Sequence, residues 1–287
     1  MRPREVFTSR GFSTTCIPHL QIWLYMGNRR LVKQAFLTAN PMCCFCGGAT
    51  PAVEEDHIPA RSLFRQRQWP EGYVFPACAA CNDASSLDEL TIGWIVRVQF
   101  RDSDSTDETE LAAALGKVWR RRPEWFDQMR ELSRVETRKH LRERQLTSAQ
   151  FPGGEVYVVK LPTVFLDALD RYAVKLGKAL YYLHTGKILP SSGHIHSKAL
   201  TNAEFMSPNF PLEKFEVFRT SPPMSRGNRD LSNQFAYRYG VPEEGGGAGF
   251  VVQFRESVAM LILVFEDHAK FLKRREALTT AHDVSSE

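Results

Sequence analysis

The chain has 287 residues, of which 43% are hydrophobic, 11% aromatic and 24% charged. This composition is typical of a globular chain with a sizeable core, and it excludes collagen-like and wholly disordered architectures. The longest apolar run, residues 258–265, has eight residues, far fewer than the roughly 20 that a membrane-spanning helix needs. We therefore expect a protein of about two domains without a membrane partner.

Charge is distributed unevenly along the chain, although the net charge of +4 is too small to identify a partner. Residues 1–42 carry six Lys/Arg and one acid, residues 43–90 carry three basic and seven acidic residues, and residues 117–144 carry ten basic and five acidic residues. An acidic segment between basic ones is typical of a metal-dependent site on a polyanion, because carboxylates hold cations and Lys/Arg contact phosphate. Solvated helix faces of different charge are the alternative interpretation.

Residues 1–40 have few acids, several arginines and scattered hydroxyl residues. This pattern is typical of a basic, disordered N-terminal arm or of an organelle transit peptide, and we prefer the arm.

The cysteines give the sharpest signal. Cys43 and Cys46 form one C-x-x-C motif, Cys78 and Cys81 form a second, and 31 residues separate the two. Each motif can bend the backbone into a knuckle that directs two sulfurs at one ion, so the pattern predicts a structural zinc ion held by four thiolates. A redox motif and four buried small residues are the alternatives. Six cysteines do not suggest a disulfide scaffold in a chain of this length, and we expect a cytoplasmic protein.

The segment between the two motifs predicts two short strands. Residues 53–58 form the first, which ends at Pro59 because proline cannot extend a central ladder. Residues 73–76 form the second and lead into the second cysteine motif. The apolar spacing of Leu87, Leu90 and Trp94 then predicts a helix.

This order of motifs resembles the zinc-stabilised HNH endonucleases. The motifs that carry the resemblance are Cys43-x-x-Cys46, Asp56-His57-Ile58-Pro59 and Pro76-x-Cys78-x-x-Cys81-Asn82. The resemblance covers about residues 43–90 and implies a treble-clef, ββα-metal module within an α+β chain. It also implies hydrolysis of phosphodiester bonds in DNA.

The resemblance assigns a role to each matching residue. His57 is the general base that takes a proton from the attacking water. Asp56 and Asn82 are oxygen ligands of a catalytic Mg²⁺ or Mn²⁺ ion. In addition, Arg61 lies in the loop after the first strand, where we expect it to contact a phosphate of the nucleic acid.

One position departs from the HNH pattern. The motif's middle residue is usually an Asn that orients the base, and no Asn occurs between His57 and Cys81. By position, Tyr73 or Glu71 could hold the imidazole instead. The alternative function is therefore a zinc-stabilised nucleic-acid-binding module without catalysis, and a third is a protein-interaction role for the C-terminal half.

The remaining segments complete the expected organisation. After the arm at 1–40 and the HNH module at 41–101, a helical segment at 102–150 is predicted to contain helices over 107–121 and 124–144, with Ser105 and Glu108 at capping-box spacing. Residues 151–287 are predicted to form a C-terminal α+β domain with a mainly antiparallel sheet. Its elements are a strand at 156–161, a helix from Thr163 to about His184 that stops at Gly186, a loop with two histidines at 194–196, and strands at 215–219, 234–239, 249–255 and 258–265.

Overall fold

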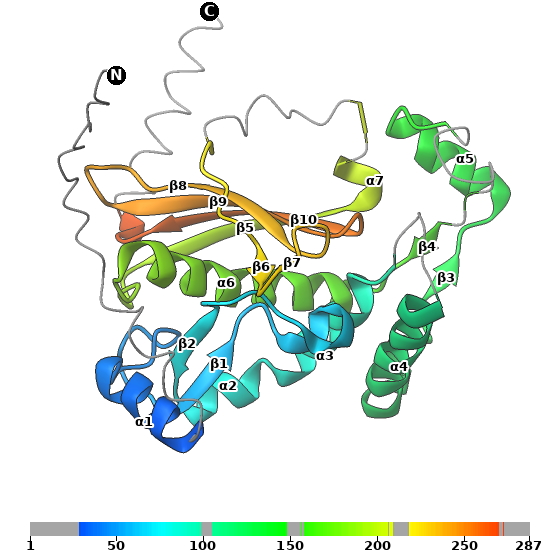
Figure 1. Cartoon of the computed structure of the whole chain (residues 1–287). Helices are drawn as coiled ribbons and strands as arrows, with labels where there is room; N and C mark the ends of the chain where they lie inside the picture. Colours follow the sequence, from blue (N-terminus) through cyan, green and yellow to red (C-terminus); the bar gives the residue numbers. More distant parts are fainter. Residues whose placement is uncertain are drawn as a thin grey trace, which may run out of the picture.

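The computed structural model describes residues 29–98, 105–147, 156, 158–205, 207–208, 218–269 and 272. Its central part has three layers (Figure 1). A four-stranded sheet lies on one side of the long helix α6 (Thr163–Thr185), and a β-hairpin with two short helices lies on the other. Helix α6 contacts strands β5, β9 and β10 of the sheet and helix α3 of the hairpin layer. It is therefore the middle layer to which both sides attach.

The sheet is entirely antiparallel, with strand order β5-β10-β9-β8. The strands are β5 (His194–Thr201), β8 (Ala236–Gly240), β9 (Gly247–Phe254) and β10 (Val258–Phe265). The register pairs Met260 of β10 with Ala199 on one side and Val252 on the other. The first residues of β9 and β10 are all buried, and from Phe250 in β9 and Met260 in β10 onward alternate residues are buried, as expected when one face of a sheet packs on a helix. The predicted antiparallel sheet is confirmed.

Helix α6 has an apolar stripe along its buried side. Its fully buried residues include Phe165, Leu169, Tyr172, Leu176 and Leu180, each at most 1% exposed. Their spacing of three and four residues places them along one side of the helix. The helix ends before Gly186, as predicted, and the Gly186 N–H donates to the Tyr182 carbonyl at 2.9 Å.

The hairpin layer contains the cysteine motifs. Its elements are α1 (Arg29–Ala39), β1 (Glu54–His57), η2 (Arg61–Leu63), η3 (Arg65–Arg67), β2 (Val74–Ala77), α2 (Ala79–Ala84) and α3 (Ser86–Ile95). Strands β1 and β2 are antiparallel and pair Asp56 with Phe75. Both predicted short strands and the helix after them are confirmed. Of the expected N-terminal arm, residues 1–28 lie outside the described residues, and the rest forms α1.

The helical segment differs from its prediction. Helix α4 (Ser105–Arg121) is present, but the second predicted helix, over 124–144, is wrong. The chain instead forms η4 (Pro123–Trp125), β3 (Arg130–Glu131) and α5 (Arg134–Glu143), and β3 pairs with β4 (Val159–Lys160).

A capping box explains where the last helix of this segment begins. The Ser133 side chain accepts from the Glu136 N–H, and the Glu136 carboxylate accepts from the Ser133 N–H. These bonds satisfy free N–H groups and start α5 at Arg134. Ser105, predicted to cap a helix, is instead the first residue of α4.

Three predictions for the C-terminal half are also corrected. The histidines at 194–196 lie in β5 and not in a loop, because β10 pairs with this segment along its whole length. The strand predicted over 156–161 is reduced to the two residues of β4. Of the strand predicted over 215–219, residues 215–217 lie outside the described residues, and Thr220 forms only an isolated bridge with Tyr239. The remaining elements are α7 (Asn202–Phe205), β6 (Ser225–Arg226) and β7 (Arg229–Asp230).

The hydrophobic core is continuous from the hairpin layer to the sheet. A single cluster of buried residues includes Phe75 of β2, Ile92 of α3, Phe165 of α6 and Ile262 of β10. It therefore joins residues on both sides of position 150. Within the part of the chain that the structure describes, no helix has the length and apolar character required to cross a membrane.

A chain of polar side chains connects the hairpin to the sheet through the core. The Tyr73 hydroxyl donates to the Tyr237 hydroxyl at 3.0 Å, and that hydroxyl lies 2.7 Å from His184 Nε2. The His184 ring also stacks on Tyr239, with ring centroids 3.7 Å apart. Burial lowers the pKa of His184 to about 4, from an ordinary value of 6.5.

This lowered pKa predicts acid sensitivity. Between pH 6.5 and about pH 5 the unfolded chain binds a proton at His184 and the folded chain does not, so the free energy of unfolding falls by about 1 kcal/mol from this residue. In His184→Phe the ring stack remains and this part of the pH dependence disappears. Urea denaturation across the pH series measures the difference. The control is Tyr237→Phe, which keeps the imidazole buried and should show the wild-type dependence of the free energy of unfolding on pH. If this free energy changed equally with pH in all three proteins, the assignment to His184 would be contradicted.

Candidate functional site

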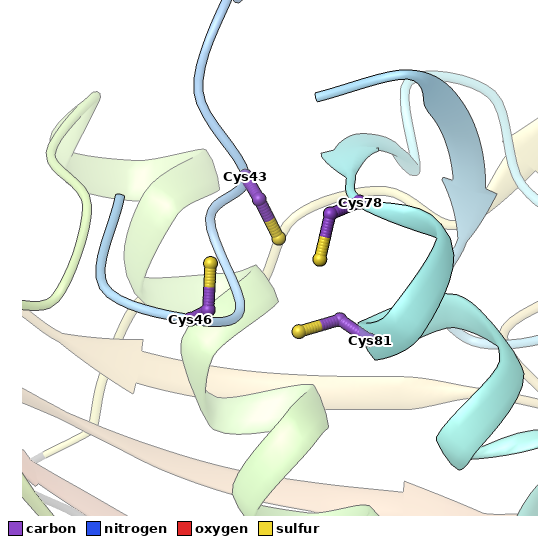
Figure 2. Close-up of side chains that lie close together, drawn as sticks. All are labelled: Cys43, Cys46, Cys78 and Cys81. Atoms are coloured by element: carbon purple, nitrogen blue, oxygen red, sulfur yellow. The ribbon is translucent and has the colours of Figure 1, made fainter. Parts of the chain in front are cut away.

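The four cysteines of the two C-x-x-C motifs converge. Their Sγ atoms all lie within 4.8 Å of one another (Figure 2). Cys43 and Cys46 come from the loop before β1, whereas Cys78 immediately precedes α2 and Cys81 lies in it. None of the four forms a disulfide bond. The pairing predicted from the sequence spacing is therefore present, with all four sulfurs directed at one point.

The backbone of the first C-x-x-C motif forms a tight turn, as expected where two sulfurs are directed at one ion. The Gly48 N–H donates to the Cys43 carbonyl at 3.1 Å, and the Cys43 N–H donates to the Thr50 carbonyl at 2.9 Å. Gly47 and Gly48 have φ of +71° and +75°, values that glycine adopts without the steric cost of a Cβ. The second pair sits on one helical turn, where the Asn82 N–H donates to the Cys78 carbonyl.

The donor set fits a metal ion. Four sulfurs around a tetrahedral ion with bonds of about 2.3 Å lie about 3.8 Å apart, a spacing that is compatible with the observed limit of 4.8 Å. The cluster also adjoins the middle layer of the fold. Lys178 Nζ of α6 donates to the Phe45 carbonyl at 2.6 Å, and Lys175 Nζ lies 5.0 Å from the centre of the Phe45 ring.

Asp56 lies on the face of β1 that packs against α6. Its side chain is buried, and its Oδ2 forms an ion pair with Lys175 Nζ at 2.5 Å. Lys175 Nζ also contacts Glu89 Oε1 at 3.0 Å and donates to the Ser85 hydroxyl. Burial lowers the pKa of Lys175, but the two carboxylates outweigh burial, so its pKa is raised and it stays charged. In this arrangement the Asp56 carboxylate is not open to a divalent cation.

Asn82, the second expected cation ligand, has a different partner. Its Nδ2 donates to Glu54 Oε2, two residues before Asp56 on the same face of β1. The two side chains predicted to share a hard cation therefore make separate contacts, one with a carboxylate and one with an ammonium group.

His57 lies on the opposite face of β1, which is half-exposed. Its Nε2 is 2.5 Å from Arg61 Nη2, and its ring makes an edge contact with Trp69 at a centroid distance of 5.0 Å. Burial is the main cause that lowers the pKa of His57 to about 4, and the positive charges of Arg61 and Arg226 add to it. The imidazole is therefore neutral near pH 7.

Arg61 determines which nitrogen of His57 carries the proton. A guanidinium group only donates hydrogen bonds, so the closer nitrogen, Nε2, accepts from Arg61 with its lone pair. The proton of the neutral ring then resides on Nδ1. Arg61 thus occupies the lone pair that a general base uses.

The two residues proposed to orient His57 in place of the missing Asn do not contact it. Tyr73 is buried and donates to Tyr237, and the Glu71 side chain accepts from the Gly227 N–H at 3.1 Å. These interpretations were wrong. The imidazole is held by Arg61, four residues further along the chain, because the turn after β1 returns toward the strand.

Three residues at the site were missed from the sequence, namely Trp69, Lys175 and Arg226. A signal existed for Lys175, which falls on the apolar stripe of α6, three residues after Tyr172. A lysine in that position is almost never buried without an acidic partner, so it indicated a buried carboxylate nearby. The positions of the other two residues depend on loop packing, and no pattern in the sequence indicates them.

Comparisons with protein-family models, with curated proteins and with solved structures find no match for this chain. The site must therefore be interpreted from its own residues.

The buried ion pair predicts a specific pattern of stabilities. Lys175→Met leaves Asp56 and Glu89 in the core without their cation, so the free energy of unfolding should fall by about 3–5 kcal/mol. Asp56→Asn combined with Lys175→Met removes one of the two uncompensated charges, so the double variant should be more stable than the sum of the single effects predicts. Urea denaturation of the two single variants and the double variant measures this coupling, and additive effects would show that the two side chains do not interact.

Proposed function

We propose that this protein is a metal-dependent endonuclease of the HNH type that hydrolyses phosphodiester bonds in DNA, with a structural zinc ion in its cluster of four cysteines. The observation that carries the proposal is the position of His57. A neutral imidazole stands at the end of β1, beside two arginines, in a hairpin-and-helix unit whose loop and helix meet at four thiols. This set supplies a base and phosphate-binding groups together.

In the proposed reaction His57 takes a proton from a water molecule that attacks the phosphorus atom. The bond from phosphorus to one ester oxygen breaks, and this leaving oxygen takes a proton from solvent. The base needs the lone pair that Arg61 now occupies. A phosphate is a better acceptor for a guanidinium than an imidazole, because it carries a full negative charge and can be bound at two oxygens. A bound phosphodiester therefore draws Arg61 toward itself and frees Nε2, which links substrate binding to activation of the base.

The proposal includes Mg²⁺ or Mn²⁺ as the catalytic cation, but the residues do not fit this ion as they stand. Asp56 is paired with Lys175, and Asn82 donates to Glu54.

The Asp56–Lys175 ion pair favours a second candidate function, a zinc-stabilised nucleic-acid-binding module without catalysis. The ammonium group neutralises the carboxylate that the nuclease motif uses for its cation. Such a protein retains DNA in a salt-dependent way and does not cleave it. In either case we propose a cytoplasmic protein, where cysteine thiolates stay reduced.

The zinc assignment predicts that the purified chain holds about one zinc ion and that Cys81→Ser holds almost none, because three thiolates and a hydroxyl form a much weaker site. Metal analysis by mass spectrometry measures the content. Cys44→Ala is the matched control, since Cys44 is a buried thiol of the same knuckle outside the four-sulfur cluster. Zinc loss from this control, or full zinc content in Cys81→Ser, would contradict the assignment.

The nuclease proposal predicts that the zinc-loaded chain nicks supercoiled plasmid when Mg²⁺ or Mn²⁺ is added. His57→Ala should reduce the nicking rate by about 10²–10⁴-fold, the usual contribution of a general base. His196→Ala, a substitution of an exposed histidine on β5, should leave the rate unchanged. Equal rates in wild type and His57→Ala would exclude His57 as the base. Salt-dependent DNA binding without nicking in Mg²⁺, Mn²⁺ or Ni²⁺ would favour the binding module.

A further inference from the structure

A small hairpin from the C-terminal half docks beside His57. It is formed by β6 and β7, which lie between the sheet and the hairpin layer in Figure 1. Its backbone is attached to Glu71, whose N–H donates to the Ser225 carbonyl at 3.0 Å and whose carboxylate accepts from the Gly227 N–H at 3.1 Å. The Arg229 side chain also donates to Gln68 Oε1. The hairpin is thus held against the loop that joins β1 to β2.

This docking brings Arg226 to the same indole as Arg61. The guanidinium carbons of Arg226 and Arg61 lie 3.9 Å and 4.1 Å from the centre of the Trp69 ring. Arg226 Nη1 also donates to the Trp69 carbonyl at 3.3 Å. With the edge contact between His57 and Trp69, the indole holds two cations and one neutral base around itself.

Another feature of this cluster is its positive charge. In the part of the chain that the structure describes, no carboxylate lies within 4.0 Å of either guanidinium group. Burial and the positive charges of Arg67, Arg226 and Arg29 lower the pKa of Arg61, and Glu55 opposes them. Placing like charges together costs free energy, which an anion bound between them recovers.

The loop that carries Arg61 is fixed before any ligand binds. Gln66 and Arg67 have φ of +53° and +56°, in the left-handed region that residues with a Cβ rarely adopt. Two bonds hold this conformation: the Arg65 N–H donates to Gln234 Oε1 at 2.7 Å, and the Gln66 N–H donates to Glu110 Oε1 at 2.8 Å. The acceptors come from two other parts of the chain, so the tertiary structure holds the loop that contains Arg61 and Arg67 in this strained form.

We propose that Arg226 is a substrate-binding residue and that, with Arg61 on Trp69, it forms a clamp for a backbone phosphate of a nucleic acid. The inference rests on the proposed function for the identity of the substrate. It extends the site into the C-terminal half: the β6–β7 hairpin completes an anion-binding surface that the cysteine-containing module lacks by itself. Two planar guanidinium groups bind phosphate oxygens in a fixed geometry, whereas the adjacent imidazole is neutral and adds no repulsion.

The test is a binding measurement that requires no cleavage. The zinc-loaded full chain is titrated, without added divalent cations, into a fluorescein-labelled DNA duplex of about 20 base pairs at several NaCl concentrations. For Arg226→Gln we expect the slope of log Kobs against log[NaCl] to be shallower by about 1, and affinity to fall by about three- to tenfold. Arg226→Lys keeps the charge and should restore the slope.

The matched control is Arg238→Gln, an exposed arginine on β8, which should bind with the wild-type slope. The inference would be overturned if Arg226→Gln and Arg238→Gln gave the same salt slope while circular dichroism showed both proteins to be folded. It would also be overturned if the wild type did not bind DNA at low salt. If the slope changes as expected but plasmid is never nicked, the clamp stands and the nuclease proposal fails. Nicking by Arg226→Gln with wild-type kcat/KM would overturn the clamp and leave the nuclease proposal intact.

Discussion

The buried ion pair between Asp56 and Lys175 holds the β1–β2 hairpin on α6. Their side chains are 6% and 9% exposed, so each charge has lost most of its water and depends on the other. Because α6 also packs on the antiparallel sheet, the pair fixes the hairpin relative to the whole C-terminal half. The first knuckle adjoins the same part of α6 through Phe45. The four thiols and the C-terminal half are thus held in one arrangement.

Because side chains alternate along β1, the residues that stabilise the fold and the candidate base lie on opposite faces of this strand. Glu54 and Asp56 face the helices, where Glu54 accepts a hydrogen bond from Asn82 and Asp56 forms an ion pair with Lys175. His57 faces the other way, toward Arg61 and Trp69. A strand of four residues therefore has one face that contributes to stability and one that remains available to a ligand. Two neighbouring residues of one motif, Asp56 and His57, have different surroundings for this reason.

Positive charge is concentrated around the half-exposed face of β1 that carries His57, although the net charge of the chain is small. The chain as a whole carries only +4. Arg29, the loop with Arg61 and Arg67, and Arg226 come from three separate segments, yet the charges of the other three arginines all act on Arg61. Such clustering is unfavourable in the free protein and becomes favourable when an anion binds, which is the physical basis of the proposed phosphate clamp.

Much of the local structure followed from short-range patterns. These patterns are the glycines after the first cysteine motif, the proline after β1 and the apolar stripe of α6. Each affects the backbone within a few residues, so the sequence by itself determined the turns at the cysteine motifs, the two short strands, and the long helix with its end. The antiparallel strands β9 and β10 were visible for the same reason, because their β-prone apolar runs are separated by a short turn. Strand β5 was not visible, since its hydrogen bonds come from β10, more than fifty residues away. The contact between His57 and Arg61 is local, but two other contacts of the candidate site are long-range like those of β5. Only the tertiary structure decided that Lys175 forms an ion pair with Asp56 and that Arg226 contacts the Trp69 ring. Each of these contacts joins residues more than a hundred positions apart, so it depends on how the layers pack.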